Sequence, residues 1–284
     1  NMSFKWLLAF SYFWLQVPYT CRTFGSGVVQ PFNGTLYHVH SDCPFTLTRF
    51  THNRVECAIS MKRGLNGLLV HVEIMINKIK TVLEDGGVQV EATKSVRLPY
   101  DHTYQHIFPY GIYTKLRSAV LPLAVIWHSV PGGIDTLWTE IELSSDMKGL
   151  CGNHLRLTSK KALSCVILDP VSTINTDCRR LFSYTLDCLM HMTPEFIRVC
   201  EENIHNFEQN QFVSCSFFKE VVRQCGSSSY IWDIWRKITH CEEPKCAGDL
   251  FYVEEGAAFV PTCSNQKTDS YDLTSSCVCP NGKE

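Results

Sequence analysis

The sequence lacks the features of several common functional classes. Its 26 Lys and Arg nearly balance 28 Asp and Glu, giving a formal charge of -2. Without a basic stripe or an acidic tail, nothing steers it toward nucleic acid or anionic lipid. The sequence contains no nucleophile elbow and no glycine-rich phosphate loop. It also contains no pair of carboxylates in surroundings that would give the two groups different pKa values. We therefore expect a protein that is not an enzyme and that binds neither nucleic acid nor membrane.

Long apolar runs are also scarce, and the clearest one lies near the start. Residues 2–5 form a short basic segment, and residues 6–17 are mostly apolar. This run is shorter than the roughly 20 residues that a membrane-spanning helix needs. We expect residues 2–20 to be a secretory signal peptide, although Thr20 makes a poor cleavage site. The alternative is a buried strand or helix of the mature fold.

Cysteine, by contrast, is abundant, with 15 among 284 residues. Such usage belongs to an oxidising compartment, so we expect a secreted, extracellular protein with several disulfides. The odd number means that one chain cannot pair all of its cysteines internally. Asn33 begins an Asn-Gly-Thr sequon and is the candidate glycosylation site, on a turn.

Residues 33–145 show the period-two pattern of β-strands. Glu140 and Glu142 alternate with apolar neighbours, so that strand has one buried and one wet face. Asp-Gly-Gly at 85–87 and Pro-Gly-Gly at 131–133 are hairpin turn signals. The pattern predicts an antiparallel β sandwich rather than strands alternating with helices. The clearest strand candidates are residues 46–50, 70–77 and 137–143.

Past the β-rich part the apolar period becomes helical. Thr-Pro-Glu at 193–195 supplies an N-cap, a first-turn proline and an early acid, and residues 217–225 repeat at helical spacing. We assign Trp232 and Trp235 to the core of this small, disulfide-pinned helical module rather than to a ligand platform. After Cys241 the chain is predicted to be a cysteine-rich loop tail, which needs disulfides to hold its shape.

The order of these parts resembles the von Willebrand factor type D family, with its D domain, eight-cysteine module and trypsin-inhibitor-like module. Within it, the sequence is most similar to the N-terminal assembly of a gastric gel-forming mucin, whose helical module also lacks cysteines near His205 and Val213. The matching stretches are Cys-Arg-Thr-Phe-Gly at 21–25, Phe-Asn-Gly-Thr-Leu-Tyr at 32–37, Cys-Pro-Phe-Thr-Leu at 43–47, Gly-Leu-Cys-Gly-Asn at 149–153, Ser-Cys at 214–215, Arg-Gln-Cys at 223–225, Trp-Arg at 235–236, Pro-Thr-Cys-Ser-Asn at 261–265 and Cys-Val-Cys-Pro-Asn-Gly at 277–282.

The resemblance implies a type D-like β domain at 21–165, an eight-cysteine-type helical module at 166–241 and a partial trypsin-inhibitor-like module at 242–284. It implies a secreted, non-enzymatic assembly module that meets like modules in a mucus or matrix network. The alternative is a serine protease inhibitor acting through the tail. Because a Pro/Thr/Ser-rich stretch is missing, we expect a fragment, a short secreted relative or a degraded copy rather than a complete gel-forming mucin.

Three departures from the family pattern limit the mechanism. Lys148 stands where the family has the first thiol of Cys-Gly-Leu-Cys, and disulfide exchange needs both sulfurs. After Asn153 the acidic calcium loop is missing, and a hard cation needs six to eight oxygens, so we expect no cofactor. In the tail, Glu255 and Phe259 occupy two cysteine positions. The loss of these cysteines weakens the interpretation of the tail as a protease inhibitor, because disulfides hold an inhibitory loop rigidly in its bound shape.

The resemblance also implies how some cysteines pair. Cys21 is expected to bond Cys151, and Cys43 to bond Cys165. Cys57 is the candidate unpaired thiol, because its family partner falls at Lys148. Its neighbours suggest partial burial, and we rank a disulfide-linked homodimer slightly ahead of an inert buried thiol. The other disulfide candidates are Cys178, Cys188, Cys200, Cys215, Cys225, Cys241, Cys246, Cys263, Cys277 and Cys279.

Two histidine pairs could suggest a metal site. His38 and His40 share a face of a strand, and His102 and His106 lie four residues apart. A zinc site built on either pair needs two more ligands from elsewhere in the chain. Eleven histidines produce such pairs by chance, so the sequence predicts no metal site.

Overall fold

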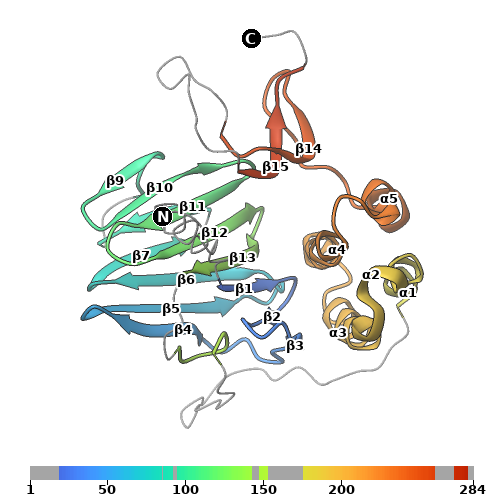
Figure 1. Ribbon diagram of the computed structural model, residues 1–284, viewed down its shortest axis with the longest axis horizontal. Helices are drawn as coiled ribbons and strands as arrows, with labels where there is room; N and C mark the ends of the chain where they lie inside the picture. The colour runs from blue at the N-terminus through green and yellow to red at the C-terminus, as the bar shows by residue number, and fades with distance from the viewer. Residues whose placement is uncertain are drawn as a thin grey trace, which may run out of the picture.

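The computed structural model describes residues 19–84, 86–91, 95–142, 147–152, 175–259 and 272–280. A large β region lies beside a group of helices, and a two-stranded hairpin stands above both (Figure 1). The strands of the β region are β1 (Tyr19–Phe24), β2 (Val28–Gln30), β3 (Tyr37–His38), β4 (Phe45–His52), β5 (Val55–Arg63), β6 (Leu69–Ile76), β7 (Ile79–Glu84), β8 (Gly87–Val90), β9 (Tyr100–His102), β10 (Gln105–Tyr110), β11 (Tyr113–Ser118), β12 (Leu123–Val130) and β13 (Gly133–Ile141).

The β region is antiparallel throughout and has two arms. One runs in the order β3-β2-β1-β13-β12-β11-β10-β9, and the other from β4 through β5, β6 and β7 to β8. They join where Ile134 of β13 pairs with Leu69 of β6. Inward-facing side chains of both arms, among them Ile59, Val72 and Val125, form one buried core. The predicted fold class, an antiparallel sandwich followed by a disulfide-rich helical part, is confirmed.

The strand candidate at 46–50 lies within β4, while those at 70–77 and 137–143 overlap β6 and β13, which end at Ile76 and Ile141. The turn at 131–133 joins β12 to β13. The expected signal peptide at 2–20 stays a prediction, but its last two residues take part in the sheet. Tyr19 and Thr20 belong to β1, where they pair with Ile141 and Glu140 of β13. The apolar alternation that builds the sheet therefore starts before the expected boundary, while residues 2–18 lie outside the described part.

The helices are α1 (Thr176–Ser183), α2 (Leu186–Leu189), the 3-10 turn η1 (Met190–Met192), α3 (Thr193–His205), α4 (Gln211–Cys225) and α5 (Tyr230–Thr239). Their shared core holds Phe196, Phe217 and Trp235, with Trp232 packed against it. Thr193, expected to cap α3, is instead its first residue, because η1 runs directly into the helix. Among the described residues no helix combines the length and the hydropathy required to cross a bilayer.

The sequence predicts that the tail is a loop throughout, but the structure contains two strands there. Strands β14 (Phe251–Ala257) and β15 (Leu273–Val278) pair as an antiparallel hairpin. The hairpin is tied to the turn between β10 and β11, where the Gly111 amide donates to the Ala258 carbonyl and the Ile112 amide to that of Ser275. These long-range backbone bonds explain why a segment without a strong apolar pattern is ordered.

Candidate functional site

The disulfides of the described residues link cysteines within the β region, within the helical part and within the tail. Cys21 at β1 is bonded to Cys151, closing a sequence separation of 130 residues. Cys43 is also disulfide-bonded, while its expected partner Cys165 and the candidate Cys263 lie outside the described residues. The other disulfides in the described ranges are Cys178–Cys200, Cys188–Cys225 and Cys215–Cys241 within the helical part, and Cys246–Cys277 in the tail.

Two described cysteines are free thiols, and their surroundings differ. Cys57, the candidate unpaired residue, is fully buried, and this burial raises the pKa of its thiol to about 12. The exposed thiol required for a homodimer through Cys57 is therefore missing, because Cys57 faces the core together with Ile59 and Met61. Cys279, expected to be in a disulfide, is instead free and exposed, while its neighbour Cys277 is bonded to Cys246.

Lys148, which replaces the first thiol of the exchange motif, lies at the edge of β4. Its backbone amide and carbonyl pair with those of Arg49 at 2.9 and 2.8 Å, and its side chain is exposed. The next residue, Gly149, has a φ of +102° and lies against the backbone of Leu47, so a side chain there would collide. Asn153 lies outside the described residues.

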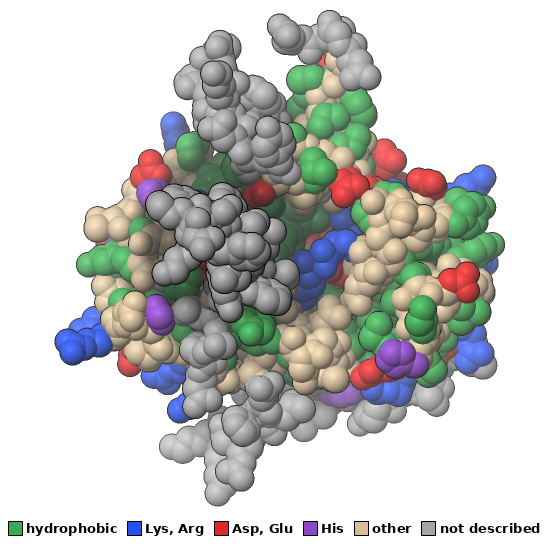
Figure 2. All heavy atoms as spheres, viewed as in Figure 1, with side chains coloured by type: hydrophobic (Ala, Val, Ile, Leu, Met, Phe, Trp, Pro, Cys, Tyr) green, Lys and Arg blue, Asp and Glu red, His purple; other side chains and the backbone are tan. Residues whose placement is uncertain are grey.

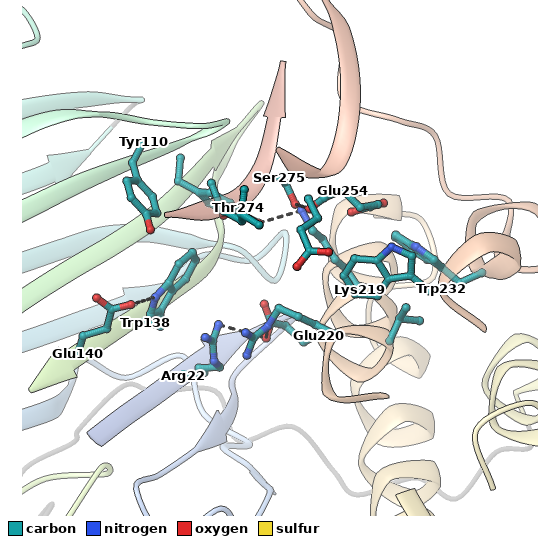
Figure 3. Close-up of a pocket in the computed structure, with 16 residues that line it drawn as sticks. Arg22, Tyr110, Trp138, Glu140, Lys219, Glu220, Trp232, Glu254, Thr274 and Ser275 are labelled. Carbon is teal, nitrogen blue, oxygen red and sulfur yellow. Dashed lines mark hydrogen bonds and ion pairs between the residues drawn. The ribbon is translucent and has the colours of Figure 1, made fainter. Parts of the chain in front are cut away.

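A cluster of charged side chains joins the β region to helix α4. Arg22 of β1 points toward Glu220 of α4, with Nη1 3.3 Å from Oε2, and its guanidinium lies 4.9 Å from the ring centre of Trp138 (Figure 3). Arg223, one turn further along α4, contacts the same carboxylate oxygen at 3.2 Å. One helix and one strand are thereby held by a buried ion pair.

The burial of this pair shapes its electrostatics. Glu220 is 2% exposed, and burial alone would raise its pKa. The positive charges of Arg22, Arg223 and Lys219 outweigh that effect, so the pKa of Glu220 lies below its ordinary value. Burial also lowers the pKa of Arg22, although the attraction of Glu220 opposes it. Glu220 therefore stays ionised at neutral pH and compensates the buried guanidinium.

Helices α4 and α5 reach β11 and the tail hairpin through a second group of polar contacts. Lys219 Nζ donates to the Tyr113 hydroxyl at 2.8 Å, linking α4 to β11. On α5, Arg236 Nη2 lies 2.7 Å from Glu254 Oε1 and donates to the Tyr252 hydroxyl at 3.1 Å. The β region, the helices and the hairpin thus meet around a single set of charges, which we call the α4 junction.

The α4 junction surrounds a cavity of about 220 Å³, lined by Arg22, Lys219, Glu220, Trp235 and Glu254 among others. Figure 2 shows Lys and Arg side chains at the bottom of a central hollow between the strands and the helices. Among the described residues, the basic groups of this cavity are matched by the acidic groups described above. The arrangement suits a structural joint better than a reaction centre.

A second contact between the β region and the helices surrounds the turn after β1. Asn203 of α3 accepts from the Ser26 amide at 3.3 Å and donates to the Ser26 carbonyl at 2.9 Å. The Gly25 amide donates to Ser216 Oγ of α4 at 3.0 Å. Gly25 has a φ of +58°, and a Cβ there would collide with Asn203 Oδ1. This glycine therefore lets α3 approach the sheet closely.

The two histidine pairs have different surroundings in the structure. His102 lies on β9 and His106 on β10, where His106 contacts Asp101, and they share no ligand set. His38 and His40 have ring centres 4.4 Å apart and lie beside Glu202 of α3. The carboxylate comes from a helix far along the chain, so local sequence patterns could not have identified it.

Asn33 is exposed, and its side chain accepts from the backbone amide and hydroxyl of Thr35, at 3.2 and 2.8 Å. The sequon thus forms an accessible turn. Glycosylation of Asn33 remains a prediction.

Comparison with known proteins finds similarity to mucins, while no family model matches the chain. It is 23% identical to mucin-6 of Gallus gallus over 298 residues, covering 92% of the chain and 25% of that protein. Human mucin-6 is also 23% identical, with coverages of 92% and 12%, and human mucin-2 is 29% identical, with 92% and 6%. The chain thus spans a quarter or less of the length of these relatives, and the matches support a mucin-type, D-domain-like region.

Proposed function

From the similarity to mucin-6 and mucin-2 over 92% of the chain, we propose that this protein is a secreted, non-enzymatic assembly module of a mucin-like extracellular glycoprotein. Its parts would be a type D-like β domain at 21–165, an eight-cysteine-type module at 166–241 and a partial trypsin-inhibitor-like module at 242–284. It would meet like modules in a mucus or matrix network.

The α4 junction is the observation that carries this proposal. An assembly module must present a fixed surface outside the cell, where chaperones do not restore it. Ion pairs from α4 and α5 hold the sheet, the helices and the hairpin together, and disulfides staple each part. Such a body keeps its shape in dilute, oxidising surroundings.

The alternative, inhibition of a serine protease by the tail, has less support from its position. Phe259, at a site where the family has a cysteine, packs on Phe108 and Tyr110 with ring centres 5.8 and 5.6 Å away. The hairpin is therefore fastened to the β region by aromatic and backbone contacts. A reactive loop for a protease needs a free, rigid tip, so a spacer role fits the tail better.

The proposal is tested with the full chain expressed through a secretory pathway. We expect the purified chain to associate with itself or with a D-type region of mucin-2 in sedimentation velocity experiments, in a concentration-dependent manner. The same material should neither slow trypsin nor reactivate a scrambled disulfide substrate. Retention of the chain inside the cell, or a monomer at all concentrations with inhibition of trypsin, would overturn the proposal in favour of the alternative.

A further inference from the structure

Three ligand-type side chains converge where β3 meets α3. His38 ends β3, His40 follows two residues later, and Glu202 lies on α3. One ligand atom of each lies within 4.8 Å of the other two. Glu202 Oε2 is 3.9 Å from His38 Nδ1 and 3.6 Å from His40 Nε2, so it is too far from both for a hydrogen bond.

The hydrogen bonding of His38 fixes which of its nitrogens is available. Nε2 lies 2.7 Å from the carbonyl oxygen of Ser26. A carbonyl can only accept, so Nε2 carries the proton and Nδ1 presents a lone pair toward Glu202. Metal-binding histidines commonly donate their second nitrogen to a backbone carbonyl in this way.

Each of these three side chains has a buried polar atom that lacks a hydrogen-bond partner. His38 Nδ1, His40 Nδ1 and Glu202 Oε2 are buried and form no hydrogen bond, and the His38 side chain has no exposed surface. Leaving buried polar atoms unpaired costs about 1–3 kcal/mol each. A native structure rarely keeps such a cluster without a ligand or an ion to satisfy it.

The spacing fits a small transition-metal cation. Bonds of about 2.0–2.1 Å in a tetrahedron place neighbouring ligand atoms about 3.4 Å apart. The two measured separations, 3.6 and 3.9 Å, need to close only slightly. Two imidazoles and one carboxylate are a known set for zinc, whereas calcium prefers six to eight oxygens.

The surrounding charge is mixed. Arg198 Nη1 donates to the other carboxylate oxygen, Glu202 Oε1, at 2.8 Å, which orients the carboxylate and leaves Oε2 toward the histidines. Arg63 donates to the backbone carbonyls of Ser26 and Ser41. Both arginines weaken the attraction for a cation, so we expect moderate affinity.

We propose that His38 Nδ1, an imidazole nitrogen of His40 and Glu202 Oε2 bind one divalent transition-metal cation of the zinc class at the junction of β3 and α3. A water molecule completes the coordination on the side of His40, whose side chain is 30% exposed. Because the ligands come from the β region and from the helical part, the cation clamps the two together.

The test is calorimetric titration of the chelator-treated full chain with Zn²⁺, in a Cys279→Ser background that removes the exposed free thiol. We expect a 1:1 complex and a higher thermal midpoint with zinc. His40→Gln and Glu202→Gln should each weaken binding by at least about tenfold, since even the loss of a supporting group costs metal sites about 10–100-fold. Calcium at the same concentration should have no effect.

His71→Gln is the matched control, because His71 faces Glu84 at 3.7 Å on the exposed surface but has no second histidine beside it. It should bind zinc like the parent. If a site variant unfolds in chelator at a lower temperature, visible absorption of a Co²⁺ complex of the parent chain decides instead. Equal zinc affinity of parent and both site variants, or a Co²⁺ spectrum typical of octahedral aquo-ion, would overturn the proposal.

Discussion

Removing the charge of Glu220 should test whether the α4 junction holds the molecule together. In Glu220→Gln the side chain keeps its size, but Arg22, whose side chain is only 11% exposed, loses its compensating carboxylate. Breaking a buried ion pair by removing one partner costs about 3–5 kcal/mol. Arg22 keeps its contact with the Trp138 ring, and Arg223 can turn to solvent, so we expect a loss of about 3 kcal/mol.

The assay is equilibrium unfolding in urea with the disulfides intact, comparing transition midpoints at equal m-values. Glu208→Gln is the control, because Glu208 forms a surface pair with His205 and should change the unfolding free energy by less than about 0.5 kcal/mol. The double variant Arg22→Met with Glu220→Leu should be more stable than Glu220→Gln, since no charge stays buried alone. A cost below about 1 kcal/mol for Glu220→Gln would refute the reasoning.

Three further outcomes can be measured. Because the folded pKa of Glu220 lies below its ordinary 4.5, its stabilisation is present above that pH and is lost as the pH falls through the acid range, so the stability gap between wild type and Glu220→Gln should narrow below about pH 5. In the native protein a maleimide should label Cys279 but not the buried Cys57, and any disulfide-linked dimer on a non-reducing gel should disappear in Cys279→Ser and persist in Cys57→Ser. For the chain freed of zinc beforehand, the thermal midpoint should be equal in millimolar calcium and in chelator, whereas a ligand at 100 times its dissociation constant would add about 2.7 kcal/mol; a clear rise with calcium would show that a calcium site exists.

The strands and helices could be predicted because their signals are local. In β6, buried and less buried residues largely alternate as the sequence pattern requires, and α4 carries its apolar residues at helical spacing. The expectation of one buried and one wet face is wrong for β13, where six consecutive residues from Ile134 to Thr139 are buried. Full burial of Cys57 had a local signal too. Cys57, Ile59 and Met61 occupy every second position of β5, so their side chains point to the same face of the sheet. This alternation predicts full burial of Cys57 better than the nearby residues Val55 and Ala58 do.

The junctions could not be predicted because their members are far apart in sequence. Arg22 and Glu220 are separated by 198 residues, and the local i,i+3 pair of Glu220 with Arg223 gives no sign of the distant Arg22. Glu202 looks like an ordinary helical surface residue until α3 is placed against β3. The order of the tail likewise depends on backbone bonds to the turn before β11, which a reading of the tail alone cannot supply.

The Cys21–Cys151 disulfide also has a mechanical consequence. Its Cα atoms are 5.7 Å apart, so the chain enters and leaves the β region at nearly one point. Tension applied between the chain before Cys21 and the chain after Cys151 would pass through the covalent bond and bypass the sheet. About 430 Å of contour length, from 130 residues at roughly 3.3 Å each, would stay folded under load until that bond is reduced. The redox state of this bond would then limit how far the β region can be extended.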